Sequence, residues 1–133
     1  MNFFRVHTTL AGVCLFAASP ALLAHHSVGA EFDVDSTVNL EGTVTKVEWF
    51  NPHIWVYLIV ESSDGLSAEY QCEGSSPNSL RRRGWTRDSL RPGDRVVITG
   101  LQARLDPYTC YARAVRLADG TRLFSGSASE LER

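Results

Sequence analysis

The strongest constraint on the fold of this chain is a run of alternating apolar residues that changes phase part of the way along. The apolar positions fall into two groups of opposite parity, which are Val38, Leu40 and Val44, then Val47 and Trp49. Alternation with a period of two is typical of a half-buried β-strand, and a change of parity indicates a β-bulge. The segment that begins at Val38 therefore predicts one long strand bent by a bulge.

Four further segments have the composition of β-strands. Residues 53–60 are almost all β-branched or aromatic, which is typical of a central strand that is apolar on both faces. Asn51-Pro52 precedes this segment and predicts a turn, because proline lacks the backbone N–H that a strand ladder needs. Ser63-Asp64-Gly65 follows it and is typical of a tight hairpin turn. The other strands are predicted over 67–72, 95–101 and 110–117, with a short continuation at 122–124.

One short helix is predicted between the third and the fourth strand. Ser76 is a favourable N-cap, and Pro77 suits the first helical position because its φ is already helical. Leu80 is expected to face the core, and the three arginines at 81–83 suit the negative end of the helix dipole. Gly84 directly after them is typical of a left-handed residue that ends a helix.

The predicted order is therefore three strands, one helix and two strands, with Gly42 inside the long bent first strand. This order indicates an all-β domain with one short helix, folded as an OB-fold-like five-stranded Greek-key barrel. A small β-sandwich built from the same elements is the alternative fold. We expect the barrel over residues 38–124, preceded by an extended arm over 25–37 and followed by a frayed polar tail over 125–133.

The first 24 residues have the order of a secretory signal peptide. A single positive charge, Arg5, precedes an apolar stretch over 9–18, and small residues follow up to Ala24. The apolar stretch is too short for a transmembrane helix, which needs roughly 20 apolar residues. Cleavage near Ala24 predicts a periplasmic or secreted protein with no stable membrane span. Cleavage after Ala21 is the alternative.

The charge and the cysteines of the mature chain narrow the classes of partner. Arg5 is one of 13 basic residues, and none of the 15 acidic residues lies before His25, so the mature net charge is −3. A clustered basic excess is the usual signature of nucleic-acid and anionic-membrane binding, so neither partner is expected. Cys72 and Cys110 remain after cleavage, and an oxidising compartment favours a structural disulfide between them. A redox-active pair is disfavoured because the Cys-x-x-Cys spacing is missing.

Three histidines form one candidate site. His25 would begin the mature protein, so its ring and its free α-amino group together offer a chelate that suits copper. His26 and His53 are candidates for the remaining metal ligands. The alternative interpretation is that the first two are polar residues beside a cleavage site and that His53 satisfies a turn by hydrogen bonding.

A cluster of aromatic and polar residues forms a second candidate site. In OB-folds the loops after the first and the fourth strand lie at the ligand-binding end. Aromatic side chains in these loops would stack on a flat or sugar-like ligand, whereas tryptophans in so small a domain commonly pack in the core. The candidate ligand-binding residues are Trp49, Asn51, His53, Trp55 and Tyr108.

The sequence favours binding over catalysis. It contains no Gly-x-Ser-x-Gly elbow, no glycine-rich phosphate loop and no nucleophile with an adjacent base, so an enzyme is not expected. We predict an exported binding or accessory domain whose partner is a small ligand, a metal or another envelope protein. An envelope protein–protein interaction module is the alternative.

Several short motifs occur in a fixed order along the mature chain. With them the chain resembles the domain of unknown function 6152 family, which consists of small exported bacterial proteins. The resemblance implies an exported OB-like domain and supplies neither an activity nor a site. The motifs are His25-His26-Ser27, Glu31-Phe32-Asp33, residues 40–49, Asn51-Pro52-His53, Ser76-Pro77-Asn78 and Arg82-Arg83-Gly84-Trp85.

Overall fold

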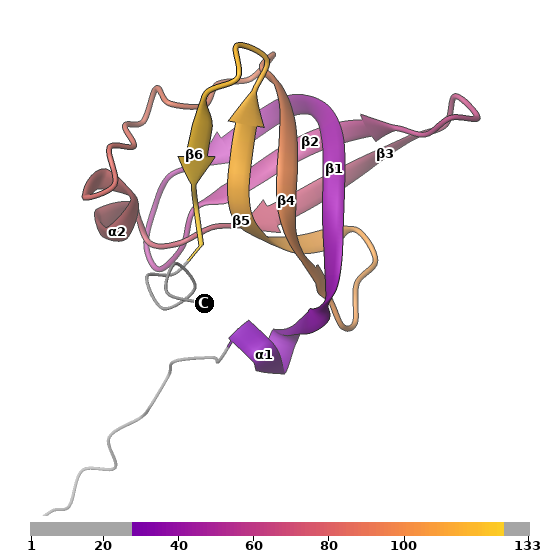
Figure 1. Cartoon of the computed structure of the whole chain (residues 1–133), viewed down its shortest axis with the longest axis horizontal. Coiled ribbons are helices and arrows are strands. Elements are labelled where there is room, and N and C mark those ends of the chain that lie inside the picture. The colour runs from indigo at the N-terminus through magenta and orange to yellow at the C-terminus, as the bar shows by residue number, and fades with distance from the viewer. Residues whose placement is uncertain (1–27, 127–133) are drawn as a thin grey trace, which may run out of the picture.

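The computed structural model describes residues 28–126, and most of these residues lie in antiparallel β-strands (Figure 1). Two short helices accompany the strands. The elements are α1 (Val28–Glu31), β1 (Phe32–Glu48), β2 (Trp55–Glu61), β3 (Ser67–Glu73), α2 (Pro77–Arg81), β4 (Arg95–Ala103), β5 (Thr109–Leu117) and β6 (Arg122–Phe124).

Five of the strands close into a ring, which confirms the predicted five-stranded barrel. The strand order is β3-β2-β1-β4-β5, and the ring closes because β5 also pairs with β3 in parallel. The short strand β6 pairs antiparallel with residues 114–116 of β5. The closing β3–β5 contact has only three register pairs, Gln71–Thr109, Cys72–Cys110 and Glu73–Tyr111. We call this short contact the seam.

The long first strand is bent as its change of parity predicts. The register of β1 on β2 shifts between Val44 and Lys46, which is the position of the bulge. Its pairing with β4 covers the first part of the strand, and its pairing with β2 covers the last part. Gly42 belongs to both ladders, because it lies opposite Val60 of β2 and Val96 of β4. The single strand β1 thus forms part of two sides of the barrel, and its curve is visible in Figure 1.

The helix α2 forms as its sequence predicts and covers one end of the core. The Ser76 hydroxyl oxygen accepts a hydrogen bond from the Ser79 N–H at 3.3 Å, and Gly84 has a φ of +88°. Leu80 and Trp85 are buried, so the segment adds apolar side chains to the barrel interior. The core cluster also contains Val44, Ile54, Val56, Leu58, Cys72, Val96, Ile98, Cys110 and Val115.

The structure corrects the predicted extended arm. Residues 28–31 form the helix α1, and β1 begins at Phe32, six residues before the predicted domain start. Tertiary contacts extend β1 to Phe32, because this residue pairs with Ala103 and its ring packs on the ring of Tyr111 at a centroid distance of 5.5 Å. Residues 25–27 lie outside the described part of the chain.

The predicted frayed tail is also wrong for its first two residues. Ser125 and Gly126 are buried, and the Ser125 hydroxyl donates to the carbonyl oxygen of Ala112 at 2.8 Å. The Ser125 N–H donates to the carbonyl oxygen of Arg113, which fixes the chain after β6. Residues 127–133 and the predicted signal peptide lie outside the described residues. Between residues 28 and 126, no helix has the length and apolar character needed to cross a membrane.

Candidate functional site

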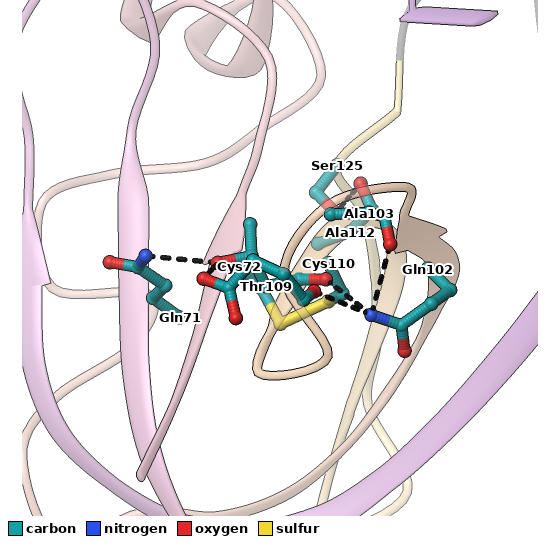
Figure 2. The surroundings of a disulfide bond; sticks show 9 residues. Gln71, Cys72, Gln102, Ala103, Thr109, Cys110, Ala112 and Ser125 are labelled. Atoms are coloured by element: carbon teal, nitrogen blue, oxygen red, sulfur yellow. Dashed lines mark hydrogen bonds between the residues drawn. A yellow bond between two sulfur atoms is a disulfide. The ribbon is translucent and has the colours of Figure 1, made fainter. Parts of the chain in front are cut away.

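The predicted disulfide is present and lies on the seam (Figure 2). Cys72 of β3 and Cys110 of β5 are direct register partners, and their Cα atoms are 4.5 Å apart. Both residues are at most 1% exposed. This burial agrees with the structural role predicted for the bond, since reactive thiols are commonly accessible to solvent.

Polar side chains on both sides of the disulfide hold the loop between β4 and β5. Gln71 donates to the Thr109 hydroxyl at 2.9 Å, and Gln102 donates to the carbonyl oxygens of Asp106 and Thr109, as Figure 2 shows in part. The Thr109 hydroxyl in turn donates to the Asp106 carboxylate at 2.6 Å. Hydrogen bonds from the Thr109 side chain and the Tyr108 N–H hold the pKa of Asp106 below its ordinary value. Asp106 is therefore an anion whose orientation is fixed.

A pocket of about 290 Å³ opens beside this network, and we call it the seam pocket. Apolar side chains supply much of its wall, whereas one threonine and three carboxylates supply its polar groups. Helix α1 and the β4–β5 loop lie together at the lower end of the barrel in Figure 1, and both contribute to the pocket. The lining residues are Ala30, Glu31, Phe32, Trp55, Glu73, Ala103, Leu105, Asp106 and Thr109.

The charged side chains that line the seam pocket within residues 28–126 are all acidic. Glu31, Glu73 and Asp106 line it, and among residues 28–126 no lysine or arginine does. The nearby Arg104 is 3.6 Å from Asp33 and also donates to the carbonyl oxygen of Gly29. The described lining therefore combines carboxylates with an apolar wall.

Of the predicted ligand-binding residues, Trp55 lines the seam pocket and His53 reaches its edge. The His53 ring contacts Glu73 through Nδ1, and Glu73 belongs to the pocket lining. Tyr108 lies on the same β4–β5 loop as Asp106 but does not line the seam pocket, and its ring packs edge-on against Tyr70 at 5.4 Å. These three residues come from the predicted loops and strand ends.

The other two predicted residues lie elsewhere. Trp49 is 7% exposed and packs against Trp85 at 6.3 Å between ring centroids, in agreement with the core-packing alternative. Asn51 is exposed and does not line the seam pocket. The structure therefore separates a packing tryptophan, Trp49, from a pocket tryptophan, Trp55.

The three histidines predicted as metal ligands are only partly described. His53 has a 45% exposed side chain, whereas the side chain of its partner Glu73 is only 10% exposed. His25 and His26 lie outside the described residues. Among residues 28–126, no three His, Cys, Asp or Glu side chains gather in a metal-binding group.

Sequence reasoning missed most of the pocket, although one signal was available. Glu73 follows Cys72 and Thr109 precedes Cys110, so a disulfide between the cysteines must bring these two polar residues near each other. Phe32, Leu105 and Asp106 carry no comparable signal, because only the closed barrel places them at the same end.

Comparison with known proteins adds a family but no activity. A model of a protein family of unknown function matches residues 13–109 of the 133-residue chain. No curated protein and no solved structure matches the chain.

Proposed function

Since the chain belongs to this family of unknown function, DUF6152, no relative assigns its activity, and we propose that it is an exported binding domain for small organic cations. The seam pocket is the proposed site. The observation that best supports the proposal is that three carboxylates, and no lysine or arginine of residues 28–126, line a pocket with apolar walls.

The pocket matches the two parts of such a ligand. Phe32 and Leu105 offer apolar surface to its body, and Trp55 adds an aromatic ring, a group that attracts cations, to the lining. Glu73 is only 8% exposed, so its charge acts where the effective dielectric constant is below that of water. A volume of about 290 Å³ lies at the lower end for small-molecule sites and indicates a small ligand.

We expect the benzylammonium ion to bind in the seam pocket and benzoate, which has the opposite charge on a similar ring, not to bind. Trp55→Ala should weaken benzylammonium binding by roughly thirtyfold, since a desolvated cation–π contact is worth about 2 kcal/mol. Asp106→Asn keeps an oxygen acceptor for Thr109 but removes the charge, so it should weaken binding as well. Calorimetric titration measures each affinity, and NMR chemical shifts locate the site.

The matched control is Phe50→Ala, which removes an aromatic side chain that is 55% exposed and does not line the pocket. Its affinity for benzylammonium should equal that of the parent. Equal binding of benzoate and benzylammonium, or an unchanged affinity in Trp55→Ala, would contradict the proposal.

A copper site is the second candidate, and the contact between His53 and Glu73 favours it. Metal-ligating histidines commonly donate the N–H of the other ring nitrogen to a carboxylate, which fixes the ring. Nδ1 of His53 faces Glu73, and this leaves Nε2 for a metal. Ala30 and Glu31 line the same pocket as Glu73, the partner of His53, and Ala30 follows His26 by four positions in the sequence.

We expect protein that begins at His25 to bind one Cu(II) through the α-amino group and ring of His25, with His26 or His53 completing the site. An added methionine before His25 and the substitution His53→Ala should each weaken binding. Affinity should also fall as the pH is lowered, because the nitrogen donors must lose their protons before they can bind the metal. Calorimetry and electron paramagnetic resonance measure these effects. Equal affinity with and without the added methionine would rule out the terminal chelate.

A further inference from the structure

Two exposed arginines lie opposite each other on β5 and β6, and neither lines the seam pocket. Arg116 of β5 is the direct antiparallel partner of Arg122 of β6. Like charges in directly opposite positions destabilise a pair of strands. The sheet therefore holds two guanidinium groups together at some cost to its own stability. We call these two residues the arginine pair.

The backbone under the arginine pair is fixed. A turn with Gly120 at a φ of +88° joins the two strands, and the Leu117 N–H donates to the carbonyl oxygen of Thr121 at 2.9 Å. Beyond the pair, the indole N–H of Trp85 donates to the carbonyl oxygen of Phe124 at 2.9 Å. β6 is thereby attached to the core, so it cannot readily shift its register to separate the two charges.

A hollow of about 240 Å³ lies beside the pair on β4 and β5. Val97, Thr99 and Ala114 line it together with the two arginines, and within the described part of the chain no carboxylate does. Short side chains there leave room for a ligand to approach both guanidinium groups.

Two acidic groups near the pair have partners of their own, and one of them, Glu41, also lines an adjoining hollow together with Arg116. Glu41 of β1 lies 3.8 Å from Arg95 of β4, and Asp119 in the turn accepts the Thr121 N–H at 2.8 Å. Within residues 28–126, neither member of the arginine pair has an ion pair or a hydrogen bond with another described side chain. Two adjacent cations thus line a hollow to which residues 28–126 contribute no carboxylate.

We propose that Arg116 and Arg122 bind the phosphate group of a ligand. Guanidinium groups form paired hydrogen bonds with the oxygens of phosphate, and such charge-assisted bonds are stronger than neutral ones. Bound phosphate also removes the repulsion between the two arginines. The site is independent of the cation pocket, since the two share no lining residue.

Titration with inorganic phosphate, followed by NMR, should give saturable shifts at Arg116, Arg122 and Val97. Arg122→Gln should weaken this binding by roughly tenfold or more, because it removes one of the two charged donors. The same variant should unfold at an equal or higher temperature without phosphate, since the repulsion is gone. Opposite effects on affinity and on stability distinguish a binding residue from a structural one.

The matched control is Arg91→Gln, which removes a surface arginine that is 3.2 Å from Asp88 and does not line the hollow. It should leave phosphate binding unchanged. Vesicles of phosphatidylglycerol and of phosphatidylcholine test a lipid as the source of the phosphate. Binding to the former alone, lost in Arg122→Gln, would identify a lipid headgroup. Absence of both phosphate and vesicle binding, or binding unchanged in Arg122→Gln, would overturn the proposal.

Discussion

Replacement of both Cys72 and Cys110 by alanine will lower the free energy of unfolding by about 4 kcal/mol. The disulfide joins residues separated by 38 positions, and closing a loop of this length restricts the unfolded chain by roughly that amount. Domains of this size have about 5–15 kcal/mol of stability, so much of the total depends on one bond. The bond also lies on the seam, where only three register pairs hold β3 to β5.

Urea unfolding of the double variant and of the oxidised parent measures the difference. The parent treated with reductant is the control for the two substitutions themselves, and it should unfold close to the variant. Because Glu73 and Thr109 flank the cysteines on the two strands, the variant should also bind benzylammonium more weakly than the parent. Coincident unfolding curves for the oxidised parent and the variant would show that the seam is stable without the disulfide.

Gly42→Ala will destabilise the barrel by about 3 kcal/mol or more, at the upper end of the cost of overpacking. A Cβ atom at position 42 would clash with the carbonyl oxygen of Ile59 and would lie 3.1 Å from Cδ1 of Leu58. The oxygen belongs to the backbone of β2, so it cannot move without disturbing the β1–β2 ladder. Gly42 also pairs with β4, and a shift of β1 would therefore disturb both of its neighbours.

Gly29→Ala provides the matched control for this substitution. A Cβ atom there meets only Cγ1 of Val34, at 3.8 Å, which is an ordinary contact. Because Gly29 lies in α1, alanine should be neutral or slightly stabilising at this position. Thermal unfolding of both variants checks the prediction, and similar melting temperatures would show that β1 adapts to the extra methyl group.

The sequence alone determined the features that depend on near neighbours in the chain. The alternation that changes phase after Val44 predicted the long bent strand and its bulge. Ser76, Pro77 and Gly84 predicted α2, because caps and turns depend on the chemistry of a few adjacent residues. The disulfide was predicted from Cys72 and Cys110 together with the expectation of export, since an oxidising compartment favours such a bond.

Only the tertiary structure decided which distant residues meet. The closing of β5 onto β3 brings Trp55, Glu73 and Asp106 to one end of the barrel, and no local pattern contains that information. The same closing explains why β1 begins at Phe32, because this residue gains its partners Ala103 and Tyr111 only in the folded barrel. A local sequence signal sets the conformation of a segment, whereas a binding pocket requires side chains that the chain separates and the fold brings together.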